Sequence, residues 1–354
     1  MADLRAGDWV EVRSAQEILA TLDERGRLEA LPFMPEMLQF CGRRFRVFKR
    51  ADRTCDTITY RGMRRMRHGV HLEGVRCDGA SHAGCQAQCL TFWKEAWLKR
   101  VDARSAAREA TAPLASNAPI DEAGLARNAR VDEQVFSCQA TELNRATTEL
   151  SRWDIRQYVR DVRSRNVQFR EVVRWIAFEV ITALLRIRGY RVWMWTYNRF
   201  ARWLGGVAYP AYTGTLTTTP IERLDLKPGE MVRITDREAI VSTLNTRNHN
   251  RGLSFDVEMV NFCGGTFRVL SRVERIIDEK TGRMIHFGNP NVVLEGVTCQ
   301  AYYKNKGCPR SIYPFWREIW LKRVEDAEGR GPLQHAKVSL REGDHRTAVR
   351  TDRT

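Results

Sequence analysis

The chain contains the stretch Phe92-Trp93-Lys94-Glu95-Ala96-Trp97-Leu98-Lys99-Arg100-Val101 and, further on, its near copy Phe315-Trp316-Arg317-Glu318-Ile319-Trp320-Leu321-Lys322-Arg323-Val324. Working outward from this pair, other segments match in the same order: Leu4–Val10 with Leu226–Val232, Phe33–Gly42 with Phe255–Gly264, Phe45–Val47 with Phe267–Val269, and Leu72–Val75 with Leu294–Val297. The register of these matches is fixed until one residue is added before Cys308. Matches maintained in this way over about a hundred residues indicate two copies of one structural unit. The sequence therefore predicts an internal duplication.

Each copy has the pattern of a small β domain. Trp9–Val12 alternates apolar and polar residues after a Gly-Asp turn, which predicts a half-buried strand. Ser14 and Glu17 have the spacing of a capping box, which predicts one short helix over residues 15–22. Further strands are predicted at residues 44–49, 70–75 and 98–101. The predicted fold class is mainly β with a helical insert, within the α+β class.

The order of these signals resembles the SH3-like barrels of translation factors and of the nitrile hydratase β-subunit. In this chain the order is the Gly7-Asp8 strand, a Pro-containing excursion, a strand with the pattern Gly42-x-x-Phe-x-Val, and the closing aromatic-acidic-aliphatic strand. The resemblance covers most of each copy and implies two SH3-like small barrels. It implies a fold and no particular activity, because such barrels have many functions. The cysteine-rich stretch 77–89 departs from these families.

Between the copies the composition changes twice. One stretch has few large apolar residues, and the next carries apolar residues at helical spacing together with many arginines and tryptophans. The predicted organisation has five parts. They are a first SH3-like repeat with a Cys-rich loop (1–101), a flexible linker (102–131), a helical Arg/Trp-rich region (132–225), a second SH3-like repeat (226–324) and a charged tail (325–354).

Composition narrows the class of protein. The 354 residues carry a formal charge of +15, no signal peptide opens the chain, and the apolar stretch 175–185 is too short to span a membrane and contains Glu179. The predominance of arginine over lysine is what a GC-rich genome produces. We expect a soluble, cytoplasmic, bacterial protein, whose nine cysteines are thiols or metal ligands rather than disulfides.

The densest group of potential metal ligands lies in the first copy. Cys77, His82, Cys85 and Cys89 fall within thirteen residues, and short Gly-containing turns allow closely spaced ligands to converge on one zinc ion. The candidate metal site also includes Cys41, and His82 is either a ligand or a donor to one. The predicted cofactor is zinc, in a structural site.

Three of these cysteines have counterparts in the second copy, where Cys263, Cys299 and Cys308 correspond to Cys41, Cys77 and Cys85. The counterparts of Cys55, His82 and Cys89 are Ile277, Asn305 and Ile312. The second copy has therefore lost its metal or takes a ligand from elsewhere, for which Cys138 is the spare thiol. The alternative for Cys41 and Cys263, and the favoured interpretation of Cys55 and Cys138, is a small buried hydrophobic residue.

An iron–sulfur cluster is the alternative to zinc as the metal centre of this group of residues. The stretch Cys77-Asp78-Gly79-Ala80-Ser81-His82 resembles the Cys-Asp-Gly-x-His signature of the small two-iron CDGSH proteins. One residue too many separates Gly79 from His82, and the upstream Cys-x-Cys pair of those proteins is missing. The sequence favours zinc over iron–sulfur.

Residues 151–206 concentrate positive charge and tryptophan. Such a region can bind nucleic acid or lie on an anionic membrane surface. The alternative is that its apolar face packs inside the protein, covered by the aromatic segment 190–204 folding back after Gly189. That face consists of Val172, Trp175, Ile176, Val180 and Leu184.

Other recurring residues have structural interpretations. Trp93 and Trp97, like Trp316 and Trp320, are four residues apart and are interpreted as core residues, with a stacking platform for a ligand as the alternative. The repeated acids, Glu36 with Glu258 and Glu73 with Glu295, are interpreted as hydrogen-bond acceptors, with Arg46 or Arg268 as partners.

The predicted function is a binding or accessory protein, because the sequence contains no phosphate-binding Gly loop, no Gly-x-Ser-x-Gly and no His-Glu-x-x-His motif. The partner is left open, and a protein partner is one possibility. One alternative is a metal- or cysteine-dependent enzyme with its site between the two copies. The other is a nucleic-acid-binding protein.

Overall fold

The computed structural model of the chain describes residues 3–102, 122–151, 154–187, 192, 194–196, 198–199, 212–303 and 305–324. Their secondary structure is mainly β with few helices. The sheets are mostly antiparallel and include one half-barrel. At this level the predicted fold class is confirmed.

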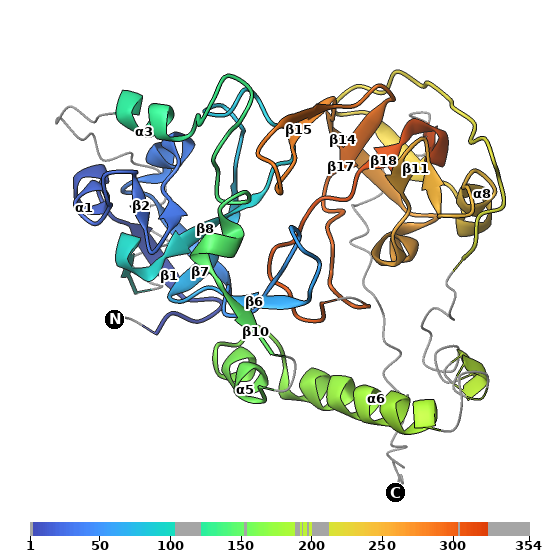
Figure 1. Cartoon of the computed structure of the whole chain (residues 1–354), viewed down its shortest axis with the longest axis horizontal. Helices are drawn as coiled ribbons and strands as arrows, with labels where there is room; N and C mark the ends of the chain where they lie inside the picture. Colours follow the sequence, from blue (N-terminus) through green and yellow to red (C-terminus); the bar gives the residue numbers. More distant parts are fainter. Residues whose placement is uncertain are drawn as a thin grey trace, which may run out of the picture.

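The first unit, residues 3–101, is built on a five-stranded sheet with strand order β8-β7-β4-β1-β9 (Figure 1). Two small hairpins, β2–β3 and β5–β6, extend from it. Its elements are β1 (Trp9–Val12), α1 (Ala15–Leu19), β2 (Arg27–Leu28), β3 (Leu31–Pro32), η1 (Pro35–Phe40), β4 (Arg44–Arg50), β5 (Thr54–Cys55), β6 (Met63–Arg65), β7 (Gly69–Arg76), β8 (Leu90–Lys94), η2 (Glu95–Trp97) and β9 (Leu98–Arg100).

The second unit, residues 226–324, has a five-stranded sheet in which corresponding strands follow the same order, β18-β17-β14-β11-β19. A register shift interrupts the β14–β17 pairing between Val269 and Ser271, as it does the β4–β7 pairing between Val47 and Lys49. The elements are β11 (Met231–Ile234), α8 (Arg237–Val241), β12 (His249–Asn250), β13 (Leu253–Ser254), η3 (Val257–Phe262), β14 (Thr266–Arg272), β15 (Arg275–Ile277), β16 (Met284–His286), β17 (Asn291–Leu294), β18 (Trp316–Arg317), η4 (Glu318–Trp320) and β19 (Leu321–Arg323).

The predicted capping box is present at the start of α1. The backbone N–H of Glu17 donates to Ser14 Oγ at 3.3 Å, and the Ser14 N–H donates to the Glu17 carboxylate at 3.0 Å. The helix ends at Leu19, earlier than predicted. The chain turns there because the Thr21 hydroxyl donates to the Ile18 carbonyl and accepts a hydrogen bond from the Trp97 indole.

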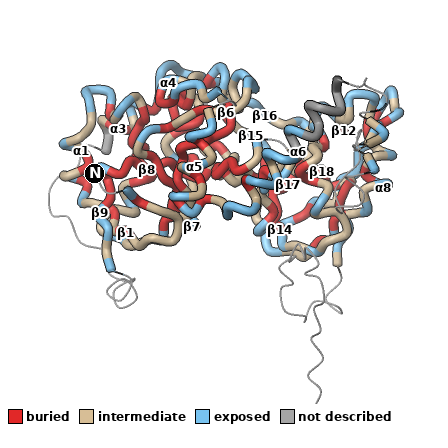
Figure 2. Tube along the Cα trace, turned by 90° about the horizontal axis from the view of Figure 1, so that it is seen from below, coloured by how far each residue is buried: buried red, intermediate tan, exposed pale blue. Residues whose placement is uncertain are grey.

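The four repeated tryptophans lie in the two hydrophobic cores and are 0% exposed, which confirms their structural interpretation. In the first unit Phe33 packs edge-on against Trp97 with ring centroids 5.2 Å apart. In the second unit Phe255 and Trp320 make the same contact at 5.6 Å. Figure 2 shows the buried residues inside the two sheet units and the exposed residues on the outer loops.

Several side chains from residues 122–150 pack in the core of the first unit, although this range was predicted as part of the linker and of the helical region. Leu125, on α3 (Glu122–Asn128), and Leu143, on α4 (Leu143–Ala146), are buried in this core. The buried Gln139 side chain accepts a hydrogen bond from the Phe92 N–H at 2.8 Å and donates to the Phe92 carbonyl at 2.9 Å. It therefore satisfies both backbone groups of a residue on β8, which is an edge strand of the sheet. Strand β10 (Thr148–Leu150) pairs with β6.

Two helices, α5 (Arg156–Arg163) and α6 (Phe169–Ile187), follow as predicted and lie below the sheets in the view of Figure 1. Val172 is buried, but Ile176 is 45% and Val180 is 51% exposed, so the apolar face of α6 is only partly covered. The aromatic segment expected to cover it falls largely outside the described residues. Among the described helices, none has both the length and the apolar character needed to cross a bilayer.

The two units contact each other through reciprocal interactions. The Cys55 N–H donates to Cys308 Sγ at 3.3 Å, and the Ile277 N–H donates to Cys85 Sγ at 3.4 Å. These two hydrogen bonds join residues at corresponding positions, because Ile277 is the counterpart of Cys55 and Cys308 is the counterpart of Cys85. The hairpin of each unit therefore packs on the Cys-containing loop of the other.

Candidate metal centre

The candidate site lies on the loop between β7 and β8, residues 77–89. The base of the loop is closed by the Cys77 N–H, which donates to the Cys89 carbonyl at 2.9 Å. The tip is a tight turn at Gly79, whose carbonyl accepts hydrogen bonds from the N–H groups of His82 at 3.1 Å and Gly84 at 2.9 Å. This turn directs His82 back over Cys77.

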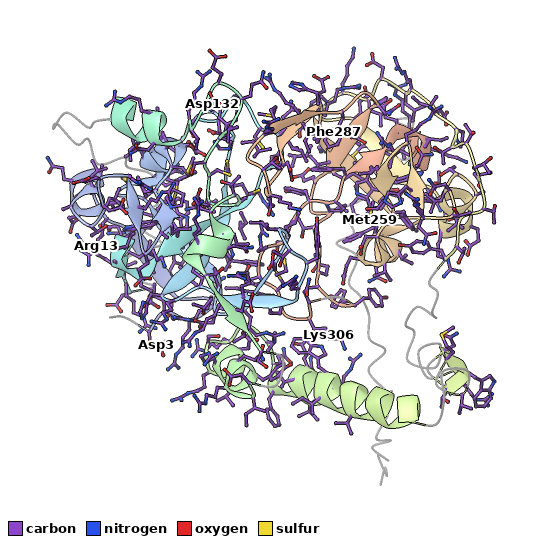
Figure 3. All side chains as sticks on the ribbon, viewed as in Figure 1. Asp3, Arg13, Asp132, Met259, Phe287 and Lys306 are labelled. Atoms are coloured by element: carbon purple, nitrogen blue, oxygen red, sulfur yellow. The ribbon has the colours of Figure 1, made fainter. Side chains whose placement is uncertain are left out.

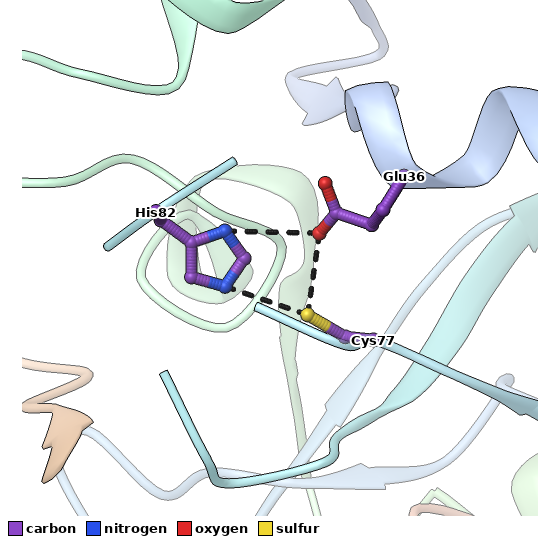
Figure 4. A group of neighbouring side chains, drawn as sticks. All are labelled: Glu36, Cys77 and His82. Carbon is purple, nitrogen blue, oxygen red and sulfur yellow. Dashed lines mark hydrogen bonds and ion pairs between the residues drawn. The ribbon is translucent and has the colours of Figure 1, made fainter. Parts of the chain in front are cut away.

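Glu36, Cys77 and His82 form a triangle of potential ligands (Figure 4). Cys77 Sγ lies 3.2 Å from Glu36 Oε1 and 3.4 Å from His82 Nε2, and His82 Nδ1 lies 3.7 Å from Glu36 Oε1. The side chains of Glu36 and His82 are each 2% exposed. This group could hold a metal ion.

Glu36 reaches the site from η1 and was not predicted as a metal ligand. It does accept hydrogen bonds, as its recurrence in the sequence suggested, but from the Ser81 hydroxyl at 2.5 Å and from the Cys77 thiol rather than from Arg46. The repeated acid Glu295, in contrast, does pair with Arg268 at 3.6 Å. The recurrence of Glu36 as Glu258 predicted a hydrogen-bond acceptor, but it did not indicate that Glu36 could bind a metal.

A cavity of about 50 Å³ adjoins the triangle. The predicted ligands Cys77, His82, Cys85 and Cys89 all line it, together with Glu36 and Cys138. The second unit closes its other side through Ile277, Glu279, Arg310 and Ile312. Since one water needs about 10–15 Å³ by this measure, the cavity has room for an ion and a few waters but not for an organic substrate.

Two cysteines lie elsewhere than the sequence suggested. Cys41 is absent from the cavity lining and packs against the hydrophobic core of the first unit at the end of η1. Cys138, interpreted as a spare thiol for the second copy, lines the cavity of the first unit instead. It does so because residues 122–150 pack on that unit. The thiol near the second unit's cysteines is Cys55, which shares a small buried cluster with Cys299 and Cys308.

Cys85 has a structural contact that accounts for its recurrence as Cys308. Both sulfur atoms accept a hydrogen bond from a backbone N–H of the opposite unit. Both residues are buried, and their hydrogen bonds connect the units. Recurrence of these cysteines is therefore explained without a metal, whereas Cys77 and His82 have no such contact across the units among the described residues.

Burial governs the protonation of the potential ligands in this site. Burial, followed by the negative charge of Glu36, raises the pKa of the Cys77 thiol, and burial raises the pKa of Cys138 to about 11. Burial also lowers the pKa of His82, which leaves its imidazole neutral. A protonated thiol is a poor nucleophile, whereas a bound cation would stabilise the thiolate that coordinates it.

The corresponding place in the second unit is arranged differently. The Glu258 carboxylate accepts hydrogen bonds from the N–H groups of Tyr302 at 3.0 Å and Tyr303 at 2.7 Å, so it holds the loop directly. Asn305 replaces His82 in the sequence. Within the described part of the second unit, no group of three ligand residues converges as Glu36, Cys77 and His82 do.

No model of a known protein family matches this chain, and no curated protein matches it. Its function is therefore inferred from its own residues and their contacts.

Replacing Gly79 with alanine is expected to disrupt the loop and the site. Gly79 has φ +75°, and a Cβ atom there would lie 2.7 Å from the backbone nitrogen of Cys85 and closer still to its carbonyl oxygen. Gly74→Ala is the control, because Gly74 has φ +72° but nothing within 4 Å of the added Cβ. We expect the control to lose about 1–2 kcal/mol of unfolding free energy in urea titrations, and Gly79→Ala to lose more. Equal losses would contradict the close packing of the turn.

Proposed function

We propose that this chain is a binding or accessory protein made of two SH3-like copies, the first of which contains a structural zinc ion. The observation that carries the proposal is the buried triangle of Glu36, Cys77 and His82. Cysteine thiolate, neutral histidine and carboxylate are all zinc ligands. A fourth ligand is available from the thiols that line the same cavity, which are Cys85, Cys89 and Cys138.

The duplication is supported by the repeated sequence segments together with the matching strand orders of the two sheets. The reciprocal hydrogen bonds at Cys85 and Cys308 add to this support. An SH3-like barrel is the fold that the order of these strands resembles. The two loops have different stabilising groups: Glu258 and backbone amides in the second copy, and a metal in the first.

A structural role for the metal is supported by the size of the cavity. Zinc with three protein ligands and an open fourth position is the usual catalytic arrangement, so an enzyme with a site between the copies is the second candidate. The location of the cavity favours this candidate, since residues of both units line it. Its volume of about 50 Å³ favours the structural role, because a substrate has no space beside the ion.

Metal analysis of the purified full-length chain tests the proposal. We expect about one zinc per chain, since among the described residues the ligand set is found only in the first copy. Cys77→Ser should release the zinc, and so should His82→Asn, which installs the residue of the second copy. The matched control is Cys299→Ser, the counterpart of Cys77, and it should retain the metal.

Three results would count against the proposal. If the purified protein is folded but contains no metal, there is no metal site. If Cys299→Ser loses zinc as readily as Cys77→Ser, the zinc is not bound at the proposed site. Visible charge-transfer absorption would show that the metal centre is an iron–sulfur cluster rather than zinc. Chelation separates the two candidate functions. Removal of a structural zinc should lower the melting temperature, whereas removal of a catalytic zinc should leave the protein folded.

A further inference from the structure

A second cavity, of about 560 Å³, lies on the first unit where α5 packs near the turn between β6 and β7. Figure 3 shows its lining residue Asp3 at the end of the first unit close to α5. Five arginines and two aspartates line it with one histidine and one serine: Arg50, Arg65, Arg67, Arg160, Arg163, Asp3, Asp52, His68 and Ser164. The volume lies within the range of small-molecule binding sites, about 300–1,000 Å³.

The acids of this cavity are already paired with one arginine. Arg50 Nε contacts Asp52 at 2.7 Å, and Arg50 Nη1 contacts Asp3 at 3.4 Å. Arg50 also pairs with the buried Glu95, which lies outside the lining. Three carboxylates therefore surround Arg50. Asp52 also acts on Arg65 through its charge, but among the described residues neither lining acid lies within ion-pair distance of the other four arginines.

The remaining arginines are poorly compensated. Arg160 Nη2 lies 3.9 Å from Asp154, beyond hydrogen-bonding distance. The buried Nε atoms of Arg65 and Arg160, and Nη2 of Arg160, have no hydrogen-bond partner. Among the described residues, no carboxylate lies within ion-pair distance of Arg65, Arg67 or Arg163. A buried charged donor without a hydrogen-bond partner destabilises a protein, and a ligand that accepts from it removes this penalty.

The arginines also repel one another. Burial and, next, the positive charge of Arg160 lower the pKa of Arg65, and Arg67 contributes in the same direction. The charges of Asp52 and Asp154 oppose this shift but do not cancel it. Clustered cations with unpaired donors are characteristic of sites that bind anions, since the ligand supplies the missing charge.

We propose that this cavity binds the phosphate groups of a small polyphosphate ligand through Arg65, Arg67, Arg160 and Arg163. Guanidinium groups match phosphate oxygens in paired hydrogen bonds, and a multiply charged anion satisfies several of them together. The described lining contains no phenylalanine, tyrosine or tryptophan on which a base would stack, and its one ring, the His68 imidazole, lies 3.7 Å from the Glu29 carboxylate. Recognition therefore rests on the phosphates. This site is separate from the proposed zinc centre and does not depend on it.

Inorganic triphosphate is the probe. Calorimetric titration of the full-length chain should show one saturable site, and triphosphate should raise the melting temperature. Arg65→Gln and Arg160→Gln should each weaken binding at least about tenfold, the effect of losing one charge-assisted hydrogen bond. Their melting temperatures without ligand should be unchanged or higher, because like-charge repulsion is relieved. Arginines with a merely structural role would give a lower melting temperature.

The matched control is Arg174→Gln, which removes the same charge from an exposed position on α6 outside the cavity. Binding weakened equally by this control, or no binding of triphosphate to the wild-type chain, would overturn the proposal. Competition identifies the source of the phosphate. Displacement of triphosphate by ATP that depends on Arg65 supports a free nucleotide. Displacement by single-stranded RNA that depends equally on Arg65 and Arg174 would show a general nucleic-acid surface and overturn the small-ligand site.

Discussion

Glu318→Ala is expected to lower the free energy of unfolding by about 3–5 kcal/mol, because each buried donor that is left without an acceptor costs about 1–3 kcal/mol. The Glu318 side chain is 0% exposed, and its Oε1 lies 3.0 Å from Arg272 Nη1. Its two oxygens also accept hydrogen bonds from the backbone N–H groups of Leu224, Asp225 and Leu226. The substitution therefore leaves three backbone amides without their acceptor, and it detaches the segment that enters the second unit. Arg272 loses one partner but still donates to the Leu226 carbonyl at 2.9 Å and contacts Asp225 at 3.3 Å.

The control is Glu295→Ala, which removes a carboxylate from the same unit. Glu295 is 58% exposed and lies 3.6 Å from Arg268, so its loss should cost less than about 1 kcal/mol. Urea titrations followed by circular dichroism measure both values. Similar losses for the two variants would show that burial of the Glu318 pair is not what stabilises this unit.

Trp97→Ala is expected to destabilise the first unit by about 3–5 kcal/mol, as large-to-small substitutions of buried aromatic residues do. Trp97 packs edge-on against both Phe33 and Trp93, with ring centroids 5.2 Å and 6.4 Å away. Its indole N–H donates to Thr21 Oγ1 at 3.0 Å, so the substitution also removes the contact that ends α1.

Trp195→Ala is the matched control, because Trp195 is 65% exposed. We expect its unfolding free energy to change by no more than about 0.5 kcal/mol, the usual range for a surface position. Thermal and urea unfolding of both variants test the prediction. A small effect of Trp97→Ala would mean that the repeated tryptophans are conserved between the copies for a reason other than packing.

The sheets could be predicted because their signals are local or repeated. Trp9–Val12 alternates with the period of a strand, and Ser14 with Glu17 forms a cap within one turn of helix. The four core tryptophans were recognisable because the two copies match in the sequence. Each of these features depends on a few neighbouring residues or on a direct comparison within the chain.

The rest depends on contacts between residues far apart in the sequence. Glu36 reaches Cys77 because η1 packs beside the loop, and no local pattern reports that distance. Gln139 pairs the edge of β8 from a segment whose composition resembled a linker or a helix. The density of potential ligands in the sequence identified Cys77 and His82 as candidates. It could not distinguish them from Cys41, which packs against the hydrophobic core of the first unit.

One contact between the units has a consequence for how this protein can change in evolution. Thr57 and Glu279 occupy corresponding positions in the two units, and their side chains contact each other, with Arg310 bound to both. In a symmetric homodimer the residue on the two-fold axis faces an identical residue, so any mutation there acts twice. Here one chain supplies both halves. Association of the halves is therefore independent of protein concentration, and a threonine can face a glutamate. The same freedom allows the loops of the two units to have different contacts, as Glu36 and Glu258 do.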